Sequence, residues 1–128
     1  MKKISIITIN YNTPQLTAKA VNTVIKGLPQ NYWEAVVIDN GSDKKIKRES
    51  VNDPSVKIIY NKKNLGFAAA VNQGIKQATG KYLLLINSDL FINGKDVDRM
   101  VAYMDKNFKV AIIAPQLIYP NGKIQNSF

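Results

Sequence analysis

The sequence predicts an α/β domain in which a mainly parallel sheet is sandwiched between helices. Short apolar, β-branched runs alternate with segments whose apolar residues recur at helical spacing, and the connections between them are short. Parallel pairing of successive strands then requires right-handed crossovers. The length of 128 residues and the 45% share of hydrophobic residues suit a single domain that spans residues 1–128.

The first strand and the first helix are predicted within residues 4–28. Residues 4–9 are apolar and β-branched, as expected of a strand covered on both faces. Thr13 is the expected N-cap of the helix, Pro14 its first residue, and Gly27 lies where the helix should end. The inward positions are expected to be Leu16, Ala20, Val24 and Leu28.

Two further strands and a second helix follow. Residues 35–38 are a short apolar run closed by turn-forming residues, and residues 56–60 predict a third strand. The helix that begins at Phe67 is expected to end at Gly80. Its inward positions are expected to be Val71, Ile75 and Ala78.

The last part of the chain predicts two more strands and a helix. Residues 82–86 form the most apolar strand, which we therefore expect at the centre of the sheet. Asn93 and Gly94 precede a third helix, and residues 110–114 predict a fifth strand that Pro115 ends. The inward positions of the third helix are expected to be Val97, Val101 and Met104.

The composition excludes several kinds of catalytic site. The chain has no cysteine and no histidine, which rules out thiol nucleophiles, thiolate zinc sites, Ser-His-Asp triads and imidazole bases. Any catalysis must rest on carboxylates, amides, hydroxyls, lysines or a metal held by oxygen.

The chain is strongly basic, with 18 lysine and arginine residues against nine acids and a net charge of +9. Such a charge attracts nucleic acid, an anionic membrane surface or phosphorylated small molecules without choosing among them. The basic residues 44–48 and the pair Lys62 and Lys63 are interpreted mainly as solvated faces. Residues 1–9 fit a strand better than a signal peptide, and no apolar run approaches the length of a spanning helix. We expect a cytoplasmic protein, with peripheral contact to an anionic inner membrane face through charge.

Polar side chains follow four of the predicted strands. In open α/β sheets, ligands bind beyond the carboxyl ends of the strands, so these positions predict a binding site, although turn formation alone places some such residues there. They are Asn10, Tyr11 and Asn12; Asp39, Asn40 and Ser42; Asn61, Asn64 and Gly66; and Asn87, Ser88 and Asp89.

Two of these strand ends allow alternative interpretations. The Asp39 carboxylate can accept a hydrogen bond from the imide N–H of uracil or thymine, or it can cap its turn through the amides of Gly41 and Ser42. Gly66 before the helix from Phe67 offers free amides to an anion, but glycines also begin helices without a ligand.

Asn72 and Asp89 are also open to two interpretations. Asn72 is polar within an otherwise apolar helix and is either exposed or directed at the site. Asp89 at the sheet edge suits Mg²⁺ or Mn²⁺ completed by waters and a diphosphate, or it caps the following turn.

Several segments, in this order, resemble the family 2 glycosyltransferases, nucleotide-sugar enzymes with the Rossmann-like GT-A fold. The rhamnosyltransferase-like branch is the most similar. Each segment alone is a weak signal, whereas the ordered set is fairly specific. The matching segments are residues 6–12 (IITINYN), 37–43 (VIDNGSD), 64–74 (NLGFAAAVNQG), 82–89 (YLLLINSD), 113–117 (IAPQL) and 119–122 (YPNG).

The resemblance implies a site for a UDP- or dTDP-sugar, with transfer of the sugar by inversion to a saccharide or lipid-linked acceptor. It implies that Asp39 binds the pyrimidine base and that Asp89 is the ligand of Mg²⁺ or Mn²⁺, in the place of the family's DXD motif. The residues expected around the donor are Ile9, Asn10, Tyr11, Asn12, Asp39, Asn40, Asn64, Gly66, Phe67, Asn72, Asn87, Ser88 and Asp89.

The sequence departs from the family pattern in two ways. Asn87 stands where the DXD motif has its first aspartate, which predicts a weaker metal site. Family members also continue past the position of Phe128, into a part that carries the acceptor platform and the catalytic base. We therefore expect a truncated GT-A domain, a fragment of a longer enzyme, that by itself transfers little or no sugar.

Other classes of protein fit the pattern less well. A response-regulator-like signalling domain needs carboxylates after its first strand, where this chain has Asn10, Tyr11 and Asn12. A dinucleotide oxidoreductase needs GxGxxG at the same place. A non-catalytic basic module that binds nucleotides or nucleic acid remains an alternative, but no aromatic residues interleave the lysines, so no specific nucleic acid is expected. The transferase interpretation requires Asp39 and Asp89 to converge on one cavity.

Overall fold

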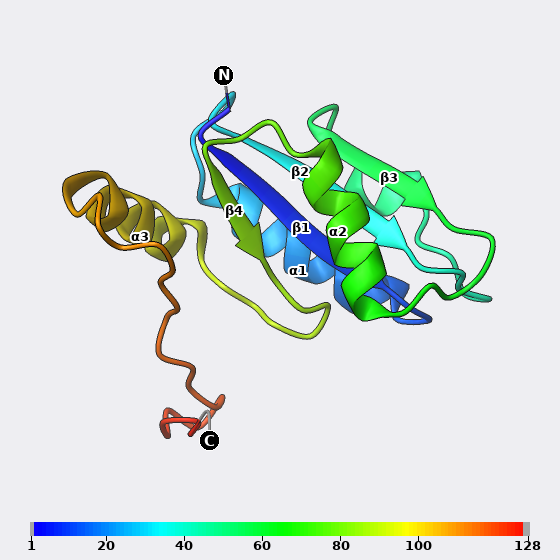
Figure 1. Ribbon diagram of the computed structural model, residues 1–128. Helices are drawn as coiled ribbons and strands as arrows, with labels where there is room; N and C mark the ends of the chain where they lie inside the picture. Colours follow the sequence, from blue (N-terminus) through cyan, green and yellow to red (C-terminus); the bar gives the residue numbers. More distant parts are fainter. Residues whose placement is uncertain (1, 127–128) are drawn as a thin grey trace.

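The computed structural model describes residues 2–126 and contains a four-stranded parallel sheet in the order β3-β2-β1-β4 (Figure 1). Three α-helices and one short 3₁₀ helix connect or follow the strands, and no α-helix in the described range is both long and apolar enough to cross a bilayer. The strands are β1 (Ile4–Asn10), β2 (Trp33–Asp39), β3 (Val56–Tyr60) and β4 (Tyr82–Leu85). The helices are α1 (Pro14–Lys26), η1 (Arg48–Val51), α2 (Phe67–Gln77) and α3 (Gly94–Lys106).

The strand register brings all the strand-end residues to one edge of the sheet. Strands β1 and β2 pair from Ile4 with Trp33 to Asn10 with Asp39, and β4 pairs with the first four residues of β1. Because every pair is parallel, the carboxyl ends of the four strands lie along the same edge. We call this edge, made by residues 10–12, 39–42, 61–66 and 86–89, the rim.

The two faces of the sheet bury different helices, as the alternation of side chains along β2 shows. Ala35 and Val37 belong to the larger core cluster, with residues of α1 and α3. Val36 and Ile38 point the other way and pack with Ala70 of α2. In Figure 1, α2 accordingly lies in front of the sheet and α1 behind it. The predicted α/β sandwich is confirmed.

The predicted limits of α1 are confirmed, but two details differ. Pro14 is its first residue and Gly27 its C-cap. The Thr13 hydroxyl does not cap the helix and instead donates to the Ser88 hydroxyl at 3.3 Å. Leu16 is exposed rather than inward, because the buried stripe is made by Thr17, Ala20, Val21 and Val24.

The predicted inward face of α2 is wrong, as is its end at Gly80. The helix ends at Gln77, and its buried residues are Ala70 and Gly74, whereas Ile75 is exposed. A Cβ atom at Gly74 would lie 2.6 Å from Cγ2 of Ile7. Small residues therefore let this helix approach β1 closely, and its larger apolar side chains turn away.

Strand β4 lies at the edge of the sheet, not at its centre as its apolar sequence predicts. Leu83 and Leu85 are 51% and 46% exposed. A run of apolar residues indicates burial only if neighbours cover it, and within residues 2–126 only β1 pairs with this strand.

The fifth strand predicted at residues 110–114 is absent from the described chain. These residues have no ladder partner, Ile112 is 87% exposed, and the only pairing between residues 107 and 126 is an isolated bridge of Ile118 with Ile124. Figure 1 shows this segment leading away from the sheet after α3. A β-branched run forms a strand only where a neighbouring strand offers its backbone groups.

Candidate functional site

The centre of the rim is the carboxylate of Asp39, which is completely buried at the end of β2. Its Oδ2 accepts hydrogen bonds from Asn10 Nδ2 and from the Ile46 amide, both at 2.8 Å. Its Oδ1 accepts one bond from the Ser42 amide at 3.1 Å. Three donors, one from β1 and two from the loop after β2, therefore share one carboxylate.

These bonds bear on the two interpretations of Asp39. The capping interpretation is supported at Ser42, but the second amide belongs to Ile46 rather than to Gly41. Tyr60 holds the same loop, since its hydroxyl donates to the Ile46 carbonyl at 2.8 Å. Burial, together with the negative charge of Asp39, raises the pKa of Tyr60, so this donor keeps its proton. The predicted contact of Asp39 with a base stays a prediction.

A chain of polar contacts runs along the rim from Asp39 toward Asp89. Asn10, bonded to Asp39 through its Nδ2, presents its Oδ1 to the Thr17 hydroxyl at 2.9 Å. That hydroxyl also lies 3.0 Å from the carbonyl of Thr13, and the Thr13 hydroxyl reaches Ser88, the residue before Asp89. The two predicted carboxylates thus follow strands on the same edge and are not on opposite sides of the molecule.

An amide network joins the ends of β2 and β3 to the start of α2. Asn40 is buried, and its Nδ2 lies 2.9 Å from Asn64 Oδ1. Its Oδ1 accepts from Asn61 Nδ2 at 3.0 Å and from the Leu65 amide at 3.1 Å. Two of the predicted site residues, Asn40 and Asn64, therefore hold each other in place.

The turn after β2 depends on Gly41. Its φ is +76°, and a Cβ atom there would lie 2.3 Å from the carbonyl carbon of Lys63. Only glycine allows the turn after β2 to pack against the loop that leads to α2.

At the start of α2, the backbone has the open geometry that helix N-termini use to bind anions. Gly66, the N-cap residue, has φ +84°, and a Cβ atom there would meet nothing within 4 Å. The amides of the first helical residues, from Phe67 to Ala69, have no acceptor within the helix and carry its positive dipole end. Phe67 is exposed, and Asn72 further along α2 is exposed as well, which answers the question that the sequence left open.

The end of β4 is the exposed part of the rim. Asn87 and Asp89 are exposed, and within residues 2–126 the Asp89 carboxylate forms no hydrogen bond or ion pair. No group of three potential acidic or histidine ligands exists among the described residues. A single free carboxylate fits Mg²⁺ or Mn²⁺ only if a diphosphate and water supply the other ligands. Asp89 is exposed, and its role as a metal ligand stays a prediction.

The segment after β1 completes the rim. Asn12 has φ +60°; its amide donates to the Ser42 hydroxyl, and its Oδ1 accepts from the Lys44 amide. Tyr11 is half exposed at the surface, whereas Ile9 is partly buried and packs on the α2 side of the sheet. Within residues 10–12, Tyr11 carries the one large exposed side chain.

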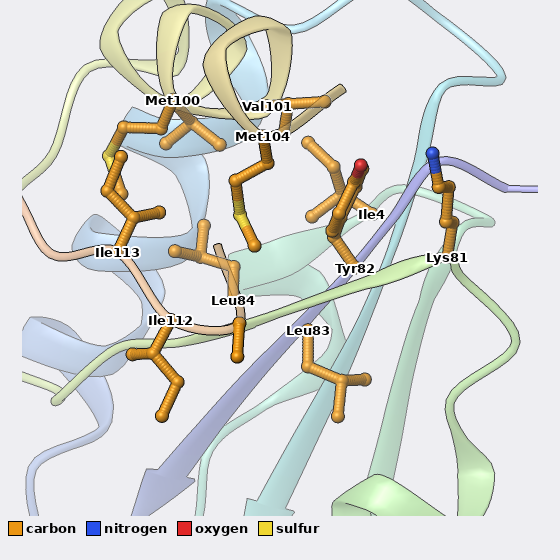
Figure 2. A pocket seen from close by; sticks show the side chains of 12 residues that line it. Ile4, Lys81, Tyr82, Leu83, Leu84, Met100, Val101, Met104, Ile112 and Ile113 are labelled. Atoms are coloured by element: carbon orange, nitrogen blue, oxygen red, sulfur yellow. The ribbon is translucent and has the colours of Figure 1, made fainter. Parts of the chain in front are cut away.

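An apolar hollow of about 400 Å³ lies elsewhere, between β4 and α3. Figure 2 shows Met100 and Met104 of α3 facing β4, with Ile112 and Ile113 alongside. This hollow contains no carboxylate and none of the predicted donor-binding residues. This hollow and two further hollows beside α1 are lined by residues other than Asp39 and Asp89, so the convergence of the two carboxylates on one cavity stays a prediction.

Sequence reasoning overlooked two residues that connect the rim. Thr17 is completely buried and joins Asn10 to the start of α1, while Gln73 exchanges two hydrogen bonds with Asn61. A signal for Thr17 existed, because it is a polar residue on the inward stripe of a helix that begins at the rim. Gln73 had no comparable signal, since an amide on α2 is equally compatible with exposure.

Comparison with known proteins gives a consistent result. The family model described as glycosyl transferase family 2 matches residues 5–126. An uncharacterized glycosyltransferase of Methanocaldococcus jannaschii is 25% identical, and the match covers 98% of this chain and 46% of that protein. The Escherichia coli protein UDP-Glc:alpha-D-GlcNAc-diphosphoundecaprenol beta-1,3-glucosyltransferase WfgD is 27% identical, over 81% of this chain and 42% of that one.

Solved structures share the fold. A crystal structure of S. aureus TarS in complex with UDP-GlcNAc has a TM-score of 0.72 at 25% identity, and the match covers 83% of this chain and 32% of that one. A mannosyltransferase from Pyrobaculum calidifontis in complex with GDP-Man and Mn²⁺ has a TM-score of 0.70 at 20% identity, over 80% of this chain and 32% of that one. The chain spans less than half the length of the first curated relatives that it matches.

Proposed function

The chain belongs to glycosyl transferase family 2, and from this premise we propose that it is the donor-binding part of an inverting glycosyltransferase. Its donor is a UDP- or dTDP-linked sugar, and its acceptor is a saccharide or a lipid-linked saccharide. The observation that carries the proposal is the continuous rim, in which polar contacts connect Asp39 to the Ser88–Asp89 segment.

The family match favours a transferase over the signalling and nucleic-acid-binding alternatives. The choice of a uridine or thymidine diphosphate is supported by the TarS structure, which holds UDP-GlcNAc, and by the name of WfgD, a glucosyltransferase that uses UDP-Glc. The same name includes a diphosphoundecaprenol-linked sugar, which supports a lipid-linked acceptor. The membership in the rhamnosyltransferase-like branch stays a hypothesis.

We assign recognition of the pyrimidine base to Asp39. Its Oδ1 accepts one hydrogen bond in the structure, so it retains acceptor capacity for an imide N–H. Because the side chain has no exposed surface, the base reaches it only after the residues that cover it shift. The position of the carboxylate is fixed by the hydrogen bonds that it accepts from Asn10 and Ile46.

We assign the diphosphate to the exposed part of the rim. The free amides that open α2, from Phe67 to Ala69, present donors and a positive dipole end to phosphate oxygens. Asp89 holds Mg²⁺ or Mn²⁺, assisted by the Asn87 and Ser88 positions beside it. When bound, the metal neutralises the charge that develops on the departing nucleotide.

The transfer step forms one bond and breaks one. The acceptor hydroxyl oxygen attacks the anomeric carbon from the face opposite the diphosphate, and the bond from that carbon to the diphosphate oxygen breaks. The configuration of the carbon is therefore inverted. The hydroxyl proton passes to a base, which we place outside residues 1–128. This chain alone is then expected to bind donor without efficient transfer.

Isothermal titration calorimetry of UDP and dTDP, with and without Mn²⁺, tests the proposal. We expect saturable binding that Mn²⁺ strengthens about tenfold or more, and Asp89→Ala should abolish that strengthening. The matched control is Asp96→Ala, which removes an exposed carboxylate on α3 that pairs with Arg99 and with no other residue of the described chain. GDP serves as the control for base recognition and should bind more weakly than UDP.

Absence of saturable UDP and dTDP binding at millimolar concentrations would overturn the proposal. Equal loss of the Mn²⁺ effect in the Asp89 and Asp96 variants would overturn the metal assignment. Loss of the Mn²⁺-dependent gain in affinity in the Asp89 variant alone supports the metal assignment.

A further inference from the structure

The outward side of α1 carries a straight polar stripe. Gln15, Lys19, Asn22 and Lys26 recur at helical spacing, on the side opposite the buried Thr17, Ala20, Val21 and Val24. This side faces away from the sheet, and α2 lies on the other face of the sheet. The stripe is therefore separate from the α2 side of the molecule.

Two open hollows lie along this stripe, and both are lined by lysines. The first, of about 680 Å³, contains Lys19 and Lys26 from α1 together with Lys95 from the first turn of α3. The second, of about 570 Å³, contains Lys44, Lys45 and Lys47 beside the first turn of α1. The hollows adjoin, because Asn22 of the first donates at 2.8 Å to the carbonyl of Ser50, which lines the second.

The positive charge of this surface is not balanced locally. We call the six lysines that line the two hollows the basic face; they are Lys19, Lys26, Lys44, Lys45, Lys47 and Lys95. The one acid among the lining residues is Asp43, and none of the six lysines takes part in a salt bridge of the described chain. The neighbouring Asp96 pairs with Arg99, and the adjoining segments also carry Glu49 of η1 and Asp89, two residues before Phe91.

The loop that carries three of these lysines is held firmly. Its Ile46 amide is bonded to the buried Asp39 carboxylate, and its Lys44 amide is bonded to Asn12. Ile46 itself is buried. The backbone between Lys44 and Lys47 is therefore fixed, so an anion does not have to order it on binding.

Apolar side chains flank the basic face. Phe91 is 44% exposed, and the Lys19 ammonium lies 4.7 Å from the centre of its ring. Leu16, one turn before Lys19 on α1, is also exposed. Lysines beside exposed leucine and phenylalanine are the composition of a surface that rests on a membrane, where phosphates meet hydrocarbon.

We propose that the basic face docks on an anionic lipid bilayer, with the six lysines at the phosphate level and Phe91 and Leu16 inserted shallowly. A bilayer fits better than nucleic acid because one aromatic ring, Phe91 at Lys19, contacts the six lysines within the described residues, whereas base stacking requires several aromatic residues among them. This docking goes beyond sugar transfer and does not rest on it. It also sets the rim beside the surface at which a lipid-linked acceptor resides.

Co-sedimentation with vesicles of phosphatidylcholine alone, or of phosphatidylcholine and phosphatidylglycerol in equal parts, tests the docking. The test variant Lys44→Gln/Lys45→Gln/Lys47→Gln and the matched control Lys76→Gln/Lys106→Gln/Lys123→Gln remove the same amount of charge. We expect the unaltered chain to bind only the anionic vesicles, and the test variant to bind them about a hundredfold more weakly, at roughly fivefold for each lysine. The control should lose far less.

A second variant and a second ligand keep the test decisive. The variant Lys19→Gln/Lys26→Gln/Lys95→Gln should weaken vesicle binding to a similar degree. Calorimetry of UDP binding to all variants separates this proposal from the transferase proposal. None of the six lysines is assigned to the donor, so UDP binding should not change with them. Equal loss in test and control variants would show attraction by net charge alone and overturn the docking. Stronger binding of a single-stranded oligonucleotide through the same lysines, at the same ionic strength, would also overturn it and identify nucleic acid as the partner.

Discussion

The two carboxylates of the rim differ sharply, although both directly follow strands of one sheet. Asp39 is completely buried and accepts three hydrogen bonds, whereas Asp89 is exposed and has no partner among residues 2–126. The Asp39 side is thus preorganised by the chain itself. The Asp89 side has its ligand positions open, which suits a site completed by a metal and a diphosphate.

The position of each strand in the sheet explains the difference. Strand β2 has β1 on one side and β3 on the other, so the loop after it is enclosed by its neighbours. Strand β4 pairs with β1 alone, and the segment after it touches the rest of the rim through the bond of Thr13 to Ser88 at 3.3 Å. Enclosure by strands on both sides therefore accounts for the burial of Asp39, and the edge position of β4 accounts for the exposure of Asp89.

Removal of each carboxylate in turn is expected to give the largest difference between the two sides of the rim. Asp39→Ala leaves three buried donors without an acceptor and should lower the free energy of unfolding by about 4 kcal/mol. Asp89→Ala should change it by less than about 0.5 kcal/mol, because the side chain is exposed and unpaired. Urea denaturation at neutral pH measures both values. Equal losses of unfolding free energy in the two variants would contradict the difference between Asp39 and Asp89.

A smaller effect distinguishes the two glycines of the rim. Alanine at Gly41 must take a positive φ and also meets the backbone of Lys63, whereas alanine at Gly66 meets only the positive φ. We expect Gly41→Ala to cost about 3 kcal/mol and Gly66→Ala about 1–2 kcal/mol. Thermal unfolding of the two variants checks the order. A larger loss at Gly66 would mean that its surroundings are more crowded than the structure shows.

The smallest expected effect concerns the stability of the folded protein at acid pH, and it involves Glu34 of β2. Burial raises the pKa of Glu34, but hydrogen bonds from Ser5 and from Thr79 outweigh it and hold that pKa below its usual value of 4.5. A lowered folded pKa gives stability that is complete above 4.5 and is lost as pH falls through the folded value. Glu34→Gln should flatten the acid limb of unfolding, as followed by circular dichroism.

Its control is Glu49→Gln, which removes an exposed acid of η1. An acid limb that is unchanged in the Glu34 variant would contradict the role of these hydrogen bonds.

Much of the fold was predictable because its signals are local. The β-branched run at residues 4–9 and the Thr13-Pro14 start of α1 depend on neighbours in the chain, and both predictions are confirmed. The prediction that β4 lies at the centre of the sheet is wrong. The position of a strand depends on which strands pair with it, and an apolar run does not specify its pairing partners. The face of α2 failed for a related reason, since close packing at Gly74 selects small residues over large ones.

The alternation of strands and helices, and the collection of polar residues at one edge of the sheet, follow from local sequence patterns. Parallel pairing alone brings the carboxyl ends of successive strands together. Only the tertiary structure decided that Asp39 is enclosed and that Asp89 is open. Burial and hydrogen bonding depend on residues that are distant in the chain, such as Asn10 and Ile46 around Asp39, and no local pattern specifies which of them will meet.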